Sequence, residues 1–90
     1  MIKPAEPFAS MRPHRQERYI KAKNLWEITV TPPRALSFKP SVVLLTQDQY
    51  ERYTEWRLGK ALIQDVLSEL SADVREQLMS GIGPEDFAKL

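Results

Sequence analysis

The sequence contains no cysteine, only one histidine, His14, and three glycines. Without cysteine there is no disulfide bond and no thiolate metal site, and a single imidazole does not make a histidine metal site. No apolar run approaches the roughly 20 residues that span a bilayer; the longest is Val42 to Leu45. The start of the chain also lacks an apolar run of signal-peptide length. These absences predict a soluble protein with no membrane partner, and they fit a reducing cytoplasm.

Charge is distributed unevenly along the chain. Residues 1–40 carry eight basic and three acidic side chains, whereas residues 41–90 carry five basic and nine acidic ones. Ninety residues suffice for one domain only. Three prolines, Pro4, Pro7 and Pro13, disfavour regular structure near the N-terminus. We therefore predict a flexible basic arm over residues 1–18 and a single small domain over residues 19–90, with a short helical turn within residues 15–23.

A short β element is predicted over about residues 25–45. Trp26, Ile28 and Val30 alternate with polar residues, as in a half-buried strand. The dipeptide Pro32-Pro33 ends this strand, because proline donates no ladder hydrogen bond. Residues 36–39 alternate again and residues 42–45 are apolar, so both segments are candidates for pairing with the first strand.

The second half of the chain shows helical signals. Thr46 with Gln49 fits a capping box that opens a helix over residues 46–58, and Gly59 breaks it. A further helix is predicted over residues 60–69, another over residues 72–80 between Ser71 and Gly81, and a last one over residues 84–89 from Pro84. The apolar stripe of the second helix consists of Leu62, Ile63, Val66, Leu67 and Leu70. The predicted fold class is α+β, mainly α, with an extended N-terminal arm.

The order of these segments resembles that in a group of phage proteins. The matching blocks are residues 46–50, 56–59, 62–67, 70–76 and 79–87. Within residues 42–90 they resemble small uncharacterised proteins from the compact genomes of single-stranded DNA phages of the microvirus type. The sequence departs from that pattern with Ser68-Glu69 in place of a usual proline and with Phe87 in place of a usual tryptophan. The resemblance implies a phage origin, in the host cytoplasm or on the virion, and supplies no catalytic residues.

No residue pattern points to catalysis. His14 lies beside Pro13 in the basic segment, without a partner that would orient it as a general base. The carboxylates of the second half alternate with basic residues at helical spacing, which is typical of solvated helix faces. Residues 81–83 precede a helix but lack the length and the lysine of a phosphate loop. We expect a protein that is not an enzyme and that has no cofactor, metal or small-molecule ligand.

Two groups of residues are candidates for contact with a partner. The first would bind phosphate or a protein partner and consists of Arg12, His14, Arg15, Arg18, Tyr19, Lys21 and Lys23. The second would form an interface on the first helix and consists of Tyr50, Tyr53, Trp56 and Arg57. The leading hypothesis is a non-catalytic interaction or assembly protein, either homo-oligomeric or bound to another protein. The alternatives are a nucleic-acid-associated accessory protein that uses the basic arm, and a small inhibitor of a host enzyme.

Overall fold

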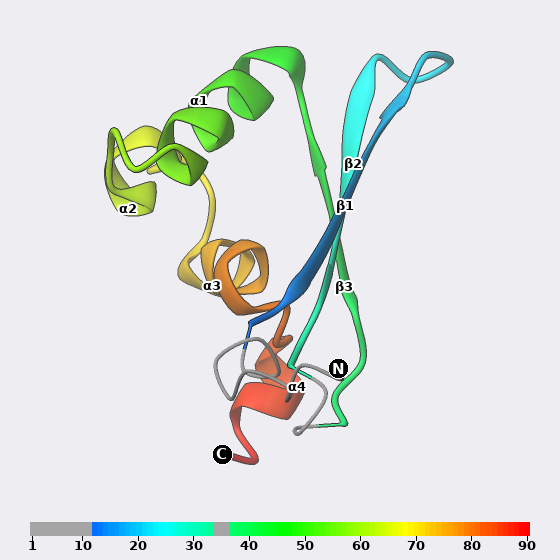
Figure 1. Ribbon diagram of the computed structural model, residues 1–90, viewed down its shortest axis with the longest axis vertical. Helices are drawn as coiled ribbons and strands as arrows, with labels where there is room; N and C mark the ends of the chain where they lie inside the picture. The colour runs from blue at the N-terminus through cyan, green and yellow to red at the C-terminus, as the bar shows by residue number, and fades with distance from the viewer. Residues whose placement is uncertain (1–11, 34–36) are drawn as a thin grey trace, which may run out of the picture.

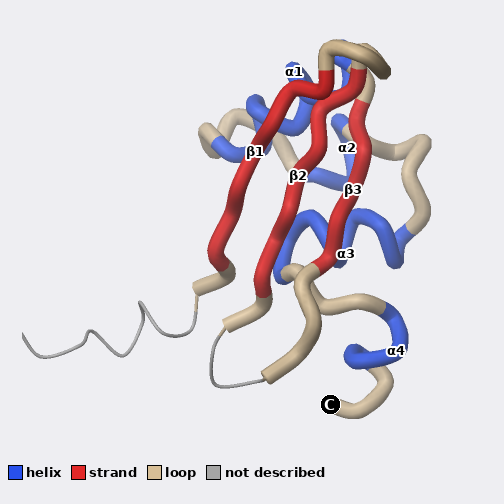
Figure 2. The backbone as a smooth tube through the Cα atoms, turned by 90° about the vertical axis from the view of Figure 1, so that its right-hand side faces the viewer, coloured by secondary structure: helices blue, strands red, loops and turns tan. Residues whose placement is uncertain are grey.

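The computed structural model describes residues 12–33 and 37–90 and shows two layers, a sheet on one side and helices on the other (Figure 1). The strands are β1 (His14–Ile20), β2 (Leu25–Thr31) and β3 (Ser41–Leu45). The helices are α1 (Gln47–Arg57), α2 (Ile63–Val66), α3 (Ala72–Ser80) and α4 (Pro84–Phe87). α1 and α3 pack on β2 and β3, so the helical layer covers one face of the sheet, and among the described residues none covers the other face (Figure 2).

The three strands form an antiparallel sheet in the order β1-β2-β3. Tyr19 lies opposite Trp26, and Ile28 lies opposite Val43. The turn between β1 and β2 includes Asn24, which has φ 54°. Asparagine tolerates this left-handed conformation better than most residues, and the turn is a four-residue connection between Ile20 and Leu25.

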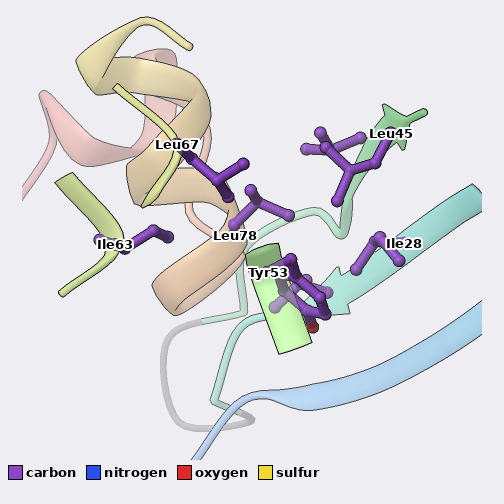
Figure 3. Packing of buried hydrophobic residues seen from close by; sticks show 8 residues of the cluster. Ile28, Leu45, Tyr53, Ile63, Leu67 and Leu78 are labelled. Atoms are coloured by element: carbon purple, nitrogen blue, oxygen red, sulfur yellow. The ribbon is translucent and has the colours of Figure 1, made fainter. Parts of the chain in front are cut away.

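The core lies between β2, β3 and the helices. Ile28 and Val30 of β2 and Leu45 of β3 are fully buried, as the alternation of the sequence requires. Three residues of the helical layer pack in the same cluster as these strand residues: Tyr53 of α1, Leu67 just after α2, and Leu78 of α3 (Figure 3). Burial of a side chain of this size contributes about 1.5–3 kcal/mol.

Local signals set where the main helices begin. The Thr46 hydroxyl accepts from the Gln49 backbone N–H at 3.2 Å, and the Gln49 side-chain oxygen accepts from the Thr46 N–H at 3.0 Å. Ser71 caps α3 in a similar way, accepting from the Val74 N–H at 3.2 Å. Such side-chain acceptors satisfy amides that have no partner inside the helix.

The end of α3 is held against the sheet at Gly81. Gly81 has φ 79°, a left-handed conformation that glycine adopts without cost. Its Cα lies so close to β2 that an added Cβ would stand 2.5 Å from the Val30 carbonyl oxygen. The buried Ser41 hydroxyl of β3 donates to the Gly81 carbonyl oxygen at 2.7 Å. Gly81 therefore joins α3 to both β2 and β3.

An ion-pair network joins α1 to the segment between α2 and α3. The Arg52 guanidinium contacts Asp48 at 2.8 Å and Glu69 at 2.5 Å, and it also donates to the Val66 carbonyl oxygen at 2.6 Å. The hydrogen bond from Arg52 is the main reason that the pKa of Glu69 is lowered to about 2. The same bond raises the pKa of Arg52 further above its usual value.

The prediction of a mainly α fold is wrong, because a complete three-stranded sheet forms one of the two layers. The missed strand is β1, His14–Ile20, where the sequence analysis placed the end of the arm and a helical turn. β1 lacks apolar alternation because its inward side chains are Arg15, Glu17 and Tyr19, which α1 and β2 satisfy by polar and aromatic contacts. Residues 1–11 of the expected arm lie outside the described residues.

Other predicted boundaries also need correction. The extended segment expected over residues 36–39 is not a strand: Ser37 to Lys39 are irregular and Leu36 lies outside the described residues. The helix expected over residues 60–69 is only the four-residue α2, because Leu62 before it and Leu67 after it have non-helical backbone angles. The last helix ends at Phe87 rather than at residue 89. α3 occupies the predicted range, Ala72–Ser80.

Candidate interaction surfaces

The structure brings the two candidate groups into contact through Arg15. Its guanidinium donates to the Tyr53 hydroxyl at 3.2 Å and lies 5.2 Å from the centre of the Trp56 ring. It also donates to the carbonyl oxygens of Leu78 and, at 2.8 Å, of Met79. These carbonyls belong to the last turn of α3, where a cation is favoured by the helix dipole. Arg15 is therefore occupied in joining β1 to α1 and α3.

Glu17 makes a second set of contacts between β1 and α1. Tyr50 donates its hydroxyl hydrogen to Glu17 at 2.6 Å, and the Tyr53 hydroxyl lies 3.3 Å from the other carboxylate oxygen. The bond to the Glu17 carboxylate is the main cause that raises the pKa of Tyr50 to about 12. Burial is the main cause that raises the pKa of Tyr53. Both phenols are therefore neutral donors at neutral pH.

Five aromatic side chains form a row of ring contacts from β1 and β2 to α1. Trp26 stacks on Tyr50 with ring centres 3.8 Å apart, and Tyr50 lies 6.0 Å from Tyr53. Tyr19 begins the row at the hairpin, 5.4 Å from Trp26, and Trp56 ends it, 5.8 Å from Tyr53. Tyr53 is completely buried and belongs to the core. The predicted interface on the first helix is therefore largely used inside the molecule.

Of the predicted helix interface, Arg57 alone is exposed. Its guanidinium lies 5.7 Å from the centre of the Trp56 ring, on which Arg15 also lies. Trp56 and Tyr50 are partly buried against the core. The indole N–H of Trp26 donates to Gln47 at 2.8 Å, which fixes the first turn of α1 against β2.

The remaining members of the basic group stay on the surface. Arg12, His14, Lys21 and Lys23 are exposed. Arg18 forms an ion pair with Glu27 of β2 at 3.2 Å, but its side chain is 72% exposed. His14 is at the start of β1, paired with Thr31 across the strands. Arg15 thus points to the helical layer, whereas the basic side chains of Arg12, Arg18, Lys21 and Lys23 are exposed.

The open face of the sheet is a surface that the sequence analysis missed. Val42 and Leu44 of β3 alternate with the buried Val43 and Leu45, so they project from the opposite face and are 56% and 44% exposed. Figure 2 shows that face toward the viewer, with α1 and α3 on the far side of the sheet and α4 beyond the ends of the strands. The signal was present as the apolar run Val42 to Leu45, which was predicted only to pair with the first strand; in a strand, alternate residues of such a run face opposite sides of the sheet.

Two cavities lie at the α4 end of the molecule. One, of about 290 Å³, is lined by Lys39 and Pro40 before β3 and by residues of β3, α3 and α4, among them Gln77 and Asp86. The Lys39 backbone N–H donates to Asp86 at 3.3 Å across it. The other, of about 180 Å³, has Asp73 and Phe87 in its wall.

Across residues 12–33 and 37–90, no three His, Asp or Glu side chains gather closely enough to hold a metal ion. None of the helices in this described part is both long and apolar enough to cross a membrane.

No protein-family model, curated protein or solved structure matches this chain.

Proposed function

We propose that this protein is a non-catalytic interaction protein, phage-encoded, that binds a protein partner through the open face of its sheet. The observation that carries the proposal is the exposure of Val42 and Leu44 on that face. The proposed setting is the host cytoplasm or the virion, as the resemblance over residues 42–90 implies. The open face and its two apolar side chains support the choice of a protein partner.

The outward positions of β3 depart from the usual pattern of a solvated sheet face. In a sheet with one covered face, outward residues are normally polar. β2 follows this rule with Glu27 and Thr29, which lie opposite Leu44 and Val42 respectively. β3 breaks it at both outward positions inside the strand. An apolar pair at the edge of an open sheet is favourable when a partner covers it, and costs solubility otherwise.

The inner face of the sheet cannot serve as this surface, because it is already packed. Val43 and Leu45 are buried beneath α1 and α3. The helical layer also exposes Leu58 and Leu62, but these stand in the connection between α1 and α2, outside any strand. They provide a matched control: two exposed leucines on the opposite layer of the same molecule.

The test is chemical cross-linking and co-purification of tagged protein from its native source. Val42→Thr with Leu44→Thr keeps strand propensity but removes apolar surface, so we expect the cross-linked partner to disappear. Leu58→Gln with Leu62→Gln should retain it. Retention by the β3 double variant, or equal loss in both variants, would contradict the proposal. Light scattering of the purified wild type identifies the case in which the partner is a second copy.

A further inference from the structure

The turn that joins β1 to β2 carries a cationic surface that the proposed protein contact does not use. We define the hairpin tip as residues 18–26; it contains Arg18, Lys21 and Lys23 and no acidic residue. We propose that the hairpin tip binds single-stranded nucleic acid, with Lys21, Lys23 and Arg18 on phosphates and with Tyr19, on the face of β1 opposite Arg18, stacked on an unpaired base. This goes beyond the proposed function: Arg18 shares the open face with Leu44, both lying opposite Glu27, whereas Lys21 and Lys23 lie in the turn beyond the strands.

The backbone of the hairpin tip is held in one conformation. Within the turn, the Lys23 N–H donates to the Ile20 carbonyl oxygen at 3.1 Å, and the Asn24 N–H donates to Lys21 at 3.3 Å. Figure 1 shows the turn at the end of the molecule away from α4, clear of α1. The two lysines are exposed. They are therefore presented on a structured turn, so that less chain entropy is lost when a phosphate binds.

Arg18 adds a third cation beside the turn. Its contact with Glu27 is an ion pair at 3.2 Å in which the Arg18 side chain is 72% exposed and the Glu27 side chain 27%, and ion pairs near the surface contribute little to stability. A phosphate can therefore replace Glu27 with little loss to the fold. Arg15, three residues earlier, cannot act in this way because α1 and α3 already hold its guanidinium. The structure thus separates one structural arginine from the cations that are free to bind.

Tyr19 supplies an aromatic surface beside the turn, on the face of β1 opposite Arg18. Its side chain is 43% exposed, and its hydroxyl donates to the Asn24 side chain at 3.0 Å, which orients the ring. Trp26 supports the ring from within at 5.4 Å, and Tyr50 in turn stacks on Trp26. A pre-oriented, partly exposed ring favours stacking on a base that is not paired. This feature favours a single strand over a duplex.

The overall charge distribution orients a polyanion toward the sheet. The described residues from 12 to 45 carry six basic and two acidic side chains, whereas residues 46–90 carry five basic and nine acidic ones. The sheet layer is therefore positive and the helical layer negative. An anion approaching the acidic layer is repelled, and one approaching the hairpin is attracted.

The experiment is fluorescence anisotropy with a labelled oligothymidylate and with a duplex of the same length, over a range of salt concentrations. Three phosphate contacts predict a slope of log K against log salt of about −2 for the single strand. Lys21→Ala with Lys23→Ala should reduce that slope to about −0.7. Lys60→Ala with Lys89→Ala removes the same charge from the helical layer and should leave the slope unchanged.

Tyr19→Leu keeps an apolar contact with Trp26 and removes the stacking surface. We expect roughly tenfold weaker binding of the single strand with an unchanged salt slope. Circular dichroism verifies that each variant is folded. Three outcomes would each overturn the inference. The first is that the oligothymidylate does not bind at low salt, and the second is that the two lysine double variants lose the same affinity. The third is that the duplex binds as tightly as the single strand and Tyr19→Leu has no effect. Val42→Thr with Leu44→Thr should bind the oligonucleotide as the wild type does, so the two proposals fail separately.

Discussion

Gly81 offers a sharp test of how the helical layer is attached to the sheet. In the substitution Gly81→Ala the new Cβ would lie 2.5 Å from the Val30 carbonyl oxygen, 2.9 Å from the Val30 carbonyl carbon and 3.0 Å from the Pro32 nitrogen. All three are backbone atoms, so no side chain can rotate away. The end of α3 must instead move away from β2. Gly59 is the matched control, since it has a similar φ of 75° but no atom within 4 Å of an added Cβ.

The two substitutions share one cost and differ in another. At both positions, an alanine in the left-handed conformation destabilises the folded state by about 1–2 kcal/mol. At both positions, alanine also reduces the conformational freedom of the unfolded chain, which stabilises the protein by about 0.4–1 kcal/mol. Forcing extra volume into a packed contact adds about 1–3 kcal/mol, which applies to Gly81 alone. We expect Gly59→Ala to lower the free energy of unfolding by about 1 kcal/mol or less. Gly81→Ala should lower it by about 2–4 kcal/mol.

Urea unfolding followed by tryptophan fluorescence measures both values. A domain of this size is stabilised by about 5–14 kcal/mol in all, so the loss at Gly81 is a large fraction of the total. Each kcal/mol lowers the melting temperature by about 4–8 °C. Equal losses in the two variants would refute the reasoning, because they would show that backbone conformation alone sets the cost and that the approach of Gly81 to Val30 carries no strain.

Two further predictions concern the polar contacts that hold the layers together. Arg15→Lys should lower the free energy of unfolding by about 2 kcal/mol, because lysine cannot reproduce the several hydrogen bonds of the guanidinium. Arg18→Lys, on the opposite face of β1, should change the free energy of unfolding by less than about 0.5 kcal/mol. Urea unfolding of both variants measures the two changes, and equal changes would contradict the structural role of Arg15. Because the folded-state pKa of Glu69 is lowered from 4.5 to about 2 by its bond from Arg52, the contribution of Glu69 to stability is present above pH 4.5 and is lost as the pH falls toward 2. Glu69→Gln should therefore weaken the decrease in urea midpoint over that pH range, while Glu85→Gln should leave it as in the wild type; an unaltered acid profile in Glu69→Gln would count against the ion pair.

The helical boundaries that sequence reasoning predicted well are those with a side-chain signal nearby. Thr46 and Gln49 cap each other in the structure, and Ser71 caps α3. Gly81 has the left-handed conformation expected after the end of α3. These signals act over three or four residues, so they do not depend on the rest of the fold. The prediction of a helix over residues 60–69 was wrong. Its apolar stripe records that Ile63 and Leu67 are buried by tertiary contacts, and a four-residue helix is enough to bury both side chains.

The candidate residues were identified by type, but their roles depend on which face of a strand they occupy. Arg15 and Arg18 look equivalent in the sequence. In the structure Arg15 faces α1 and α3, whereas Arg18 remains 72% exposed. Sequence reasoning could not separate them because it did not recognise β1 as a strand.

By itself, the sequence determined the alternation that buries Ile28 and Val30, the caps of α1 and α3, and the charge difference between the two halves of the chain. These properties depend on residues a few positions apart. Only the tertiary structure decided that His14–Ile20 is a strand, because its inward side chains find their partners on α1, more than thirty residues away. The same long-range pairing made Tyr53 part of the core, left Val42 and Leu44 uncovered, and presented Lys21 and Lys23 on a structured turn.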